Sequence, residues 1–247
     1  MARTNTKTNS KTDTVSPSRQ RLSMTAENYL LSIYRLNEED TVVTLTQLAE
    51  HLKMLPEGEG LGTSLPTVGG MIRRLEREGL LAVDGKKQLS LTKKGQRSAE
   101  EIVRRHRLAE RMVVDMLDVE LHRAHVEAHL LEHAISEYLE ERIMEKLGNP
   151  TTSPFGYPIP GTDYVQPGPS FRLNEAPLGN RLQIDKIPVD DEVLLKHLVQ
   201  NQVIPGNQIV VREINTSTGI IAFECMDEDV VVGYQVGQFI WVRSDDE

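Results

Sequence analysis

Three histidines recur at every fourth position in the segment HVEAHLLEH, residues 125–133. Residues four apart lie on one face of an α-helix, so this spacing predicts a column of His125, His129 and His133 with Glu132 beside it. Buried without a compensating partner, such groups would be badly unsatisfied. The fold must therefore expose this face to water or gather it around a cation.

A second pair with the same spacing, His106 and Glu110, precedes that segment. Imidazole and carboxylate donors without a thiolate suit Fe(II), Mn(II), Co(II), Ni(II) or Zn(II). A lone histidine is more often a core or surface residue, but these His and Glu groups together, on two adjacent predicted helices, favour a metal site over a solvated face. Cys225 is the only cysteine, which excludes disulfide scaffolds and CxxC metal knuckles. His122 and Glu127 point elsewhere on the same helix and are expected at the surface.

Charge is divided unevenly along the 247 residues. Residues 1–111 carry 19 Lys and Arg against 14 Asp and Glu, a net of +5, and the remainder carries a net of −14, which gives −9 for the chain. A basic front fits DNA binding, although ordinary scatter explains the division equally well. No apolar run approaches the ~20 residues of a membrane span, and the N-terminus lacks the apolar core of a secretory signal. We therefore expect a cytoplasmic protein with no membrane partner.

The front of the chain is typical of a winged helix-turn-helix. Helical spacing over 25–39, 44–54 and 66–79 predicts three helices, with Thr25 as a candidate cap of the first. Thr44 and Gln47 form a capping box for the second. A Gly- and Pro-rich loop precedes the third helix, and alternating apolar residues then flank Asp84-Gly85, a two-residue hairpin signal. The alternative is a helical bundle with a solvated basic face.

The third helix is predicted to enter the major groove of DNA, with the hairpin tip against the backbone. Gly69 and Gly70 let the backbone approach DNA closely but supply no side chain to read bases. Specificity would then depend on DNA shape and on neighbours such as Thr67. The candidate DNA-binding residues are Ser64, Pro66, Thr67, Gly69, Gly70, Arg73, Arg74, Arg77, Lys86 and Lys87.

The rest of the chain changes character twice. A long helix is predicted from near Thr92 to about Leu117, followed by helices over 120–135 and 136–148. Residues 149–170 then hold six of the twelve prolines, and short β-rich segments from about 181 predict a small β-barrel of about five strands. These shifts divide an α+β chain into a disordered tail (1–21), a DNA-binding domain (22–92), a helical metal-binding and dimerisation domain (93–148), a linker (149–180) and a β-domain (181–247).

This combination resembles the diphtheria toxin repressor family of iron- or manganese-dependent transcriptional regulators. The most specific motifs are HRLAER (106–111), the HxEAxxxEH pattern of 125–133 and SPFGYPIPG (153–161). The resemblance covers roughly residues 22–245. It implies an N-terminal winged helix-turn-helix, a helical dimerisation domain and a C-terminal SH3-like β-barrel. It also implies a double-stranded DNA operator and a homodimer, and it implies neither catalysis nor a small-molecule substrate.

Two metal sites per subunit, for Mn²⁺ or Fe²⁺, follow from the resemblance. Its ancillary site carries over to His106, Glu110 and His125. Its activating site carries over to Asn28, His129, Glu132 and His133, with Asn28 where methionine or aspartate is common and His129 where cysteine or glutamate is common. This hard donor set tilts mildly toward Mn(II) without excluding Fe(II). The β-domain's contribution to the ancillary metal stays open among Asp190, Asp191 and Glu192, each of which could equally be an exposed acidic residue.

These sites suggest a mechanism in which the metal ties the DNA-reading unit, through Asn28, to the dimer frame. Binding would then select the arrangement that fits two half-sites of an operator, making the chain a regulator, expected to repress metal-uptake genes. Two alternatives remain: a metalloenzyme with a helical-bundle site, and a DNA-binding protein whose metal is purely structural. A plausible dimer surface, equally explained by core packing, comprises Ile135, Tyr138, Leu139 and Ile143.

Overall fold

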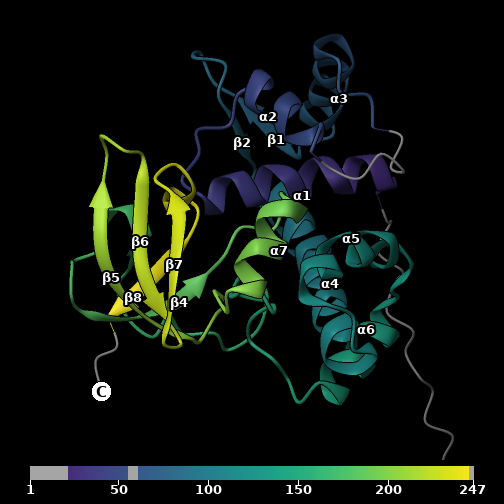
Figure 1. The fold of residues 1–247 in the computed structure, drawn as a ribbon. Helices are drawn as coiled ribbons and strands as arrows, with labels where there is room; N and C mark the ends of the chain where they lie inside the picture. The colour runs from purple at the N-terminus through teal and green to yellow at the C-terminus, as the bar shows by residue number, and fades with distance from the viewer. Residues whose placement is uncertain (1–21, 55–60, 245–247) are drawn as a thin grey trace, which may run out of the picture.

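The computed structural model describes residues 22–54 and 61–244. Figure 1 shows a helical head at the N-terminus, a helical unit in the middle and a C-terminal sheet. The expected tail over 1–21 and residues 55–60 of the expected loop lie outside the described residues. The α+β class with a winged helix-turn-helix head is confirmed.

The head contains three helices and a hairpin. Its elements are α1 (Met24–Glu38), α2 (Leu45–Leu52), α3 (Leu65–Arg77), β1 (Leu81–Val83) and β2 (Leu89–Leu91). Side-chain oxygens accept from the first free N–H groups of each helix, which is how the sequence fixes their starts. The capping box of Thr44 and Gln47 is confirmed, whereas the cap of α1 is Ser23 and not Thr25. Apolar side chains of all three helices share one core.

The wing hairpin is confirmed, but its turn is wider than the predicted two residues. Lys87 N donates to Asp84 O at 3.0 Å, and the left-handed residue is Lys87 (φ 61°). The Asp84 side chain explains the difference, because its Oδ1 accepts from the backbone of Lys86 and Gln88 at 2.8 Å each. An aspartate that bonds its own turn in this way stabilises the longer loop.

The helical unit comprises α4 (Lys93–Leu117), α5 (Leu121–Leu131), a 3₁₀ turn (Glu132–Ala134) and α6 (Glu137–Lys146). Thr92 caps α4, so the predicted start of the long helix is confirmed. The single helix expected over 120–135 is wrong, because α5 ends at Leu131 and the chain tightens into the 3₁₀ turn. Glu132 and His133 therefore leave the helical column.

The Pro-rich segment after α6 is pinned against α4 by arginines of that helix. Arg104 donates to the carbonyl of Pro160 and Arg111 to the carbonyl of Thr152, both at 2.8 Å. Within this segment Phe155 is fully buried. These contacts give the proline-rich chain a fixed course between the helical unit and the sheet.

The C-terminal sheet has six antiparallel strands in the order β3-β8-β4-β5-β6-β7. Its elements are β3 (Ser170–Arg172), β4 (Arg181–Lys186), α7 (Glu192–Gln200), β5 (Gln208–Asn215), β6 (Ile220–Cys225), β7 (Glu228–Gly233) and β8 (Trp241–Ser244). The expected C-terminal β-domain is present, but it has six described strands instead of about five, and the sheet stays open between β3 and β7 and does not close into a barrel. The additional strand, β3, is only three residues long and arises within the Pro-rich stretch.

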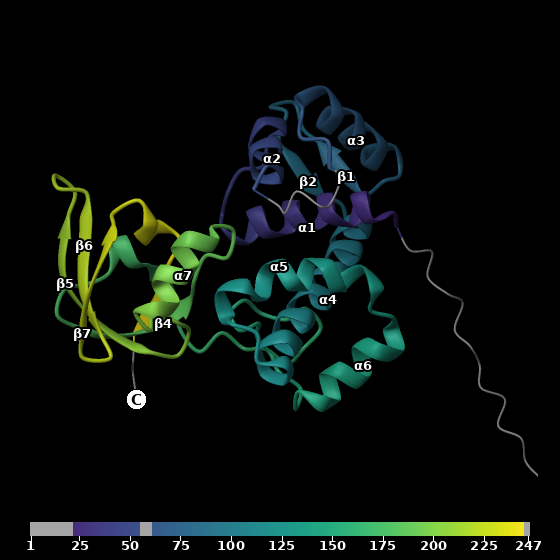
Figure 2. The ribbon, with the colours of Figure 1, turned by 45° about the vertical axis from the view of Figure 1, so that its right-hand side comes forward.

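Helix α1 lies between the other parts of the molecule. Figures 1 and 2 both place it between the rest of the head on one side and α4–α6 on the other, with α7 between the sheet and α5. At its C-terminal end, Glu39 accepts from Arg172 and from the Tyr157 hydroxyl, both at 2.6 Å. Across the described ranges, no helix combines the length and apolarity that a membrane crossing requires.

Gly95 sets how closely α4 approaches the head. A Cβ at this position would lie 1.9 Å from the carbonyl oxygen of Leu80, the residue just before β1. We expect Gly95→Ala to lower the free energy of unfolding by about 1–3 kcal/mol, the usual cost of overpacking. Gly85→Ala is the matched control, since a Cβ there meets nothing within 4 Å. Chemical denaturation measures both, and equal midpoints for the two variants would contradict the prediction.

Candidate metal centre and nucleic-acid interface

A buried cluster of imidazole and carboxylate groups joins α4, α5 and the 3₁₀ turn. His106, His125 and His129 each offer a ring nitrogen within 4.8 Å of the others, and their ring centroids lie 4.6–4.8 Å apart. Glu110 of α4 and Glu132 of the 3₁₀ turn complete the cluster, at 3% and 0% exposure. The two predicted His/Glu segments therefore meet and are hidden from water.

Hydrogen bonds inside the cluster show how its charge is compensated. His106 donates through Nε2 to Glu110 at 2.9 Å and through Nδ1 to Glu132. Burial disfavours the charged ring, yet the two carboxylates outweigh it and raise the pKa of His106. Burial opposes ionisation of Glu110 and Glu132 as well, but His106 holds the pKa of each below its usual range. Two carboxylates and one imidazolium leave a net negative charge, so the cluster suits a cation.

The head contacts this cluster through α1. His133 donates through Nδ1 to Glu27 at 2.7 Å, and its Nε2 lies 3.3 Å from Glu132 Oε1. Arg105 of α4 donates to the other oxygen of Glu27 at 2.8 Å. The expected column of three histidines is therefore broken, because His133 follows the end of α5 and faces α1. Asn28, next to Glu27, is 1% exposed.

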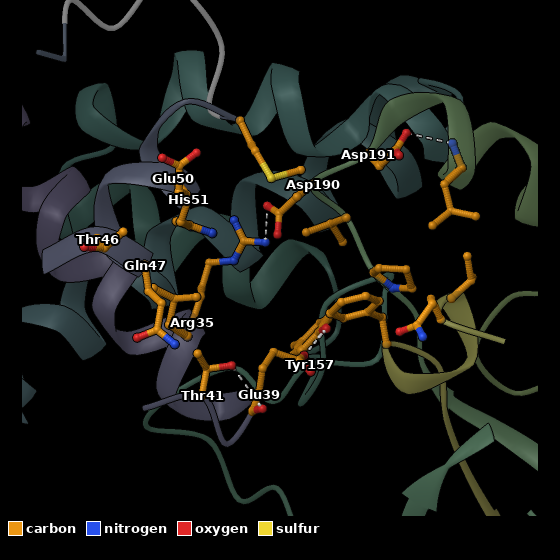
Figure 3. Close-up of a pocket in the computed structure, with 18 residues that line it drawn as sticks. Arg35, Glu39, Thr41, Thr46, Gln47, Glu50, His51, Tyr157, Asp190 and Asp191 are labelled. Carbon is orange, nitrogen blue, oxygen red and sulfur yellow. Dashed lines mark hydrogen bonds and ion pairs between the residues drawn. The ribbon is translucent and has the colours of Figure 1, made fainter. Parts of the chain in front are cut away.

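The contacts of Asp190, Asp191 and Glu192, around the start of α7, distinguish these three candidate ligands from one another. Asp190 Oδ1 lies 3.9 Å from His125 Nε2 and accepts from Arg35 at 2.7 Å. Asp191 instead caps α7, and Glu192 is exposed. Figure 3 shows the Arg35–Asp190 ion pair on the wall of a cavity of about 550 Å³ between the head and the C-terminal domain. Of the three candidates, the fold brings only Asp190 toward the histidines.

Burial is the main influence on the charge of two further histidines. It lowers the pKa of His125 to about 3, assisted by the positive charge of Arg35, so this ring is neutral at physiological pH. Burial also lowers the pKa of His51, on α2, to about 4. His122 and Glu127 are partly exposed, and Glu127 pairs with Arg123 at 2.9 Å.

The outer face of α3 is basic and exposed. Val68, Ile72 and Leu75 turn into the head core, which leaves the opposite face to solvent. The exposed candidates there and on the wing are Ser64, Pro66, Thr67, Arg73, Arg74, Arg77, Lys86 and Lys87. Ser64 caps α3 and also bonds the Thr67 hydroxyl at 2.8 Å. A Cβ at Gly69 or Gly70 would lie within 4.0 Å of the Arg73 guanidinium, so both glycines lie on this basic side.

Three family models together match almost the whole chain. They are the N-terminal DNA binding domain of the iron dependent repressor (residues 21–89), its metal binding and dimerisation domain (92–161) and the FeoA domain (171–244). The iron-dependent repressor IdeR of Mycobacterium leprae is 35% identical over 233 residues, covering 89% of this chain and 97% of the relative. The chain belongs to the iron-dependent repressor family.

Other relatives agree with this assignment. The diphtheria toxin repressor of Corynebacterium glutamicum is 34% identical over 203 residues, covering 80% of this chain and 83% of its own. The solved structure of a manganese-dependent transcriptional repressor in complex with manganese has a TM-score of 0.78 at 32% identity, covering 89% and 99%. As a member of the iron-dependent repressor family, the chain is a metal-dependent DNA-binding transcriptional regulator with a dimerisation domain, and this family consists of regulators and not of enzymes.

Two charged residues near the cluster were missed by the sequence reasoning. Glu27 directly precedes Asn28 in a largely apolar helix, and that position was the available signal. Arg35 carried no local signal, because its partners His125 and Asp190 lie 90 and 155 residues away. Of the expected dimer surface, Ile135 and Ile143 pack into the subunit's own core, whereas Tyr138 and Leu139 are exposed.

The raised pKa of His106 predicts a pH dependence of stability in the metal-free repressor. A histidine whose pKa is raised in the folded state contributes its full stabilisation below the unfolded pKa of about 6.5. This stabilisation is lost as the pH rises through the folded-state pKa. With chelator present, we expect the unfolding free energy to fall as pH rises above about 6.5, by up to about 1.4 kcal/mol per pH unit. His51 and His125, whose pKa values are lowered, change the unfolding free energy only below about pH 6.5.

Urea denaturation at several pH values measures this slope. His106→Asn should flatten it, whereas His122→Asn, on the partly exposed side of α5, should leave it unchanged. A slope that survives His106→Asn would assign the effect to another group.

Proposed function

We propose that this chain is a Mn²⁺- or Fe²⁺-dependent repressor, acting in the cytoplasm on metal-uptake genes. The observation that carries the proposal is the contact of α1 with the buried imidazole and carboxylate groups. Glu27, on a helix of the head, is bonded to His133 at 2.7 Å, and His133 lies 3.3 Å from Glu132. A cation held there would join the head to the helical unit that frames the dimer. Occupancy would then bias the spacing of the two heads of a homodimer.

The buried donors support two sites per subunit. The ancillary site would comprise His106, Glu110 and His125, which already converge. The activating site would comprise Asn28, His129, Glu132 and His133, with Glu27 beside it. Oxygen and imidazole donors suit Mn(II) and Fe(II), and a donor set without a thioether or thiolate tilts the choice toward Mn(II).

The DNA-binding surface would be the exposed face of α3 with the wing. Arg73, Arg74 and Arg77 would meet phosphates, while Thr67 and the glycine pair would allow close approach to base edges. Tyr138 and Leu139, adjacent and exposed on α6, would form part of the dimer contact. We also propose that the chain is divided into its domains near residues 22, 92, 148 and 180.

Removing an activating ligand should uncouple DNA binding from metal. We expect Glu132→Ala and His133→Ala to abolish the Mn(II)-induced gain in affinity, which for a coupled site is on the order of 5–150-fold. Mobility shifts, with and without chelator, measure this on a duplex selected with the wild-type protein and Mn(II). His122→Ala, on the adjoining helix α5, is the control. An undiminished Mn(II) response of DNA binding in both variants would reject the proposal. If DNA binding by the wild-type protein is unchanged by chelator, a purely structural metal is favoured.

The salt dependence of binding tests the DNA surface separately. Each phosphate contact contributes about 0.9 to the slope of log K against log[salt]. Arg77→Ala should reduce this slope by about 0.9 without changing which duplex is preferred. Arg212→Ala, an exposed arginine of β5 paired with Glu224, should leave the slope unchanged. If Arg77→Ala behaves like Arg212→Ala, the face of α3 does not contact DNA as proposed.

A further inference from the structure

Arg35 of α1 lies at the outer edge of the ancillary group, where the ancillary donors meet the C-terminal domain. Its Nη2 donates to Asp190 Oδ1 at 2.7 Å, and its Nη1 lies 3.2 Å from His125 Nε2. Figure 3 shows the guanidinium directed at Asp190. The Arg35 side chain is only 14% exposed, so solvent competes little with these bonds.

The contact with Arg35 fixes which nitrogen of His125 carries the proton. A guanidinium only donates hydrogen bonds, so His125 Nε2 must accept. A neutral imidazole has one N–H, which therefore lies on Nδ1 and donates to Glu110 Oε1 at 2.9 Å. Glu110 Oε1 then accepts from both His106 Nε2 and His125 Nδ1, which lie 3.0 Å apart. The other tautomer would place an N–H of His125 against an N–H of Arg35, with no carboxylate between them to accept.

Ligation by His125 requires the opposite tautomer. Its Nδ1 faces Glu110 and His106, so a cation among these three would take the Nδ1 lone pair and move the proton to Nε2. A ligating histidine normally donates this second N–H to a carboxylate or carbonyl. Asp190, 3.9 Å from Nε2, is the carboxylate in position, but Arg35 is already bound to it.

We propose that Arg35 is a positioning residue that lowers the metal affinity of the ancillary site, by holding His125 in the tautomer that does not ligate and by holding Asp190. The ancillary site then fills only when Arg35 leaves His125 and Asp190 accepts the His125 N–H. This inference rests on the proposed function, since it assumes that His106, Glu110 and His125 bind the metal. To the proposed function it adds a role for Asp190, which pairs with Arg35 in the metal-free protein and accepts from His125 when the ancillary site is filled.

The affinity test uses calorimetric titration of the full-length protein with Mn(II) alone. Arg35→Gln removes the guanidinium but keeps an oxygen that can accept from His125 Nε2. We expect the weaker of two binding events to tighten by roughly 10–100-fold, the usual effect of a partner of a metal-bound histidine. Arg35→Lys should stay near wild type. Arg104→Gln, which breaks the ion pair between Arg104 of α4 and Glu140 of α6, is the control for the loss of an arginine.

Two further measurements make the result decisive. Adding His125→Ala to Arg35→Gln should cancel the gain, which assigns it to the ancillary site. Independently, ¹⁵N spectra of histidine-labelled, metal-free wild type should show His125 protonated on Nδ1 and not on Nε2, and this needs no variant to fold. A proton on Nε2, or unchanged Mn(II) affinity in folded Arg35→Gln, overturns the inference. If DNA binding nevertheless stays Mn(II)-dependent, the proposed function survives; if wild type ignores Mn(II), both fail.

Discussion

The burial of Glu110 and Glu132 around His106 is the constraint on which the helical unit depends. Two ionised carboxylates at 3% and 0% exposure would be prohibitively costly without a nearby positive charge. His106 supplies that charge by bonding both, and in doing so it draws α4, α5 and the 3₁₀ turn to one point. Replacing such a buried charge cluster by an apolar core of the same volume is often neutral or stabilising, so stability alone does not explain these buried charges, whereas the proposed cation site does.

Helix α1 connects that cluster to everything else. Its apolar side, including Tyr29 and Leu30, belongs to the core of the head. Glu27 near its start is bonded to His133, and Arg35 and Glu39 toward its end bond Asp190 and Arg172 of the C-terminal domain. These attachments are polar and depend on charge, whereas Leu31 of α1 packs against Ile102 and Val103 of α4 in an apolar cluster. A change in charge at the cluster would act on the polar attachments and leave this apolar contact in place.

The local features of this fold were predictable from sequence, and the distant contacts were not. Helical spacing, with the capping box of Thr44 and Gln47, located the helices of the head and α4, because those signals act within a few residues. The end of α5 at Leu131 was missed because His133 is drawn toward Glu27, a partner 106 residues away. Strand β3 was missed for a similar reason: three residues carry no period, and only pairing with β8 makes them a strand. The ligand-type residues were predicted, but the arginines that restrain them were not.

The four carboxylates near the centre each have an internal cation or N–H donor from this chain. Glu27 is bonded to Arg105 and His133, Glu110 and Glu132 to His106, and Asp190 to Arg35. The metal-free protein thus pairs these carboxylates internally, while the cluster around His106 keeps a net negative charge. For an ion at the proposed sites, the affinity would be the difference between its bonds and those it displaces, including a proton from His106. Such a difference sets a concentration threshold below which the internal partners hold the carboxylates, and this is the property a sensor needs to ignore trace metal.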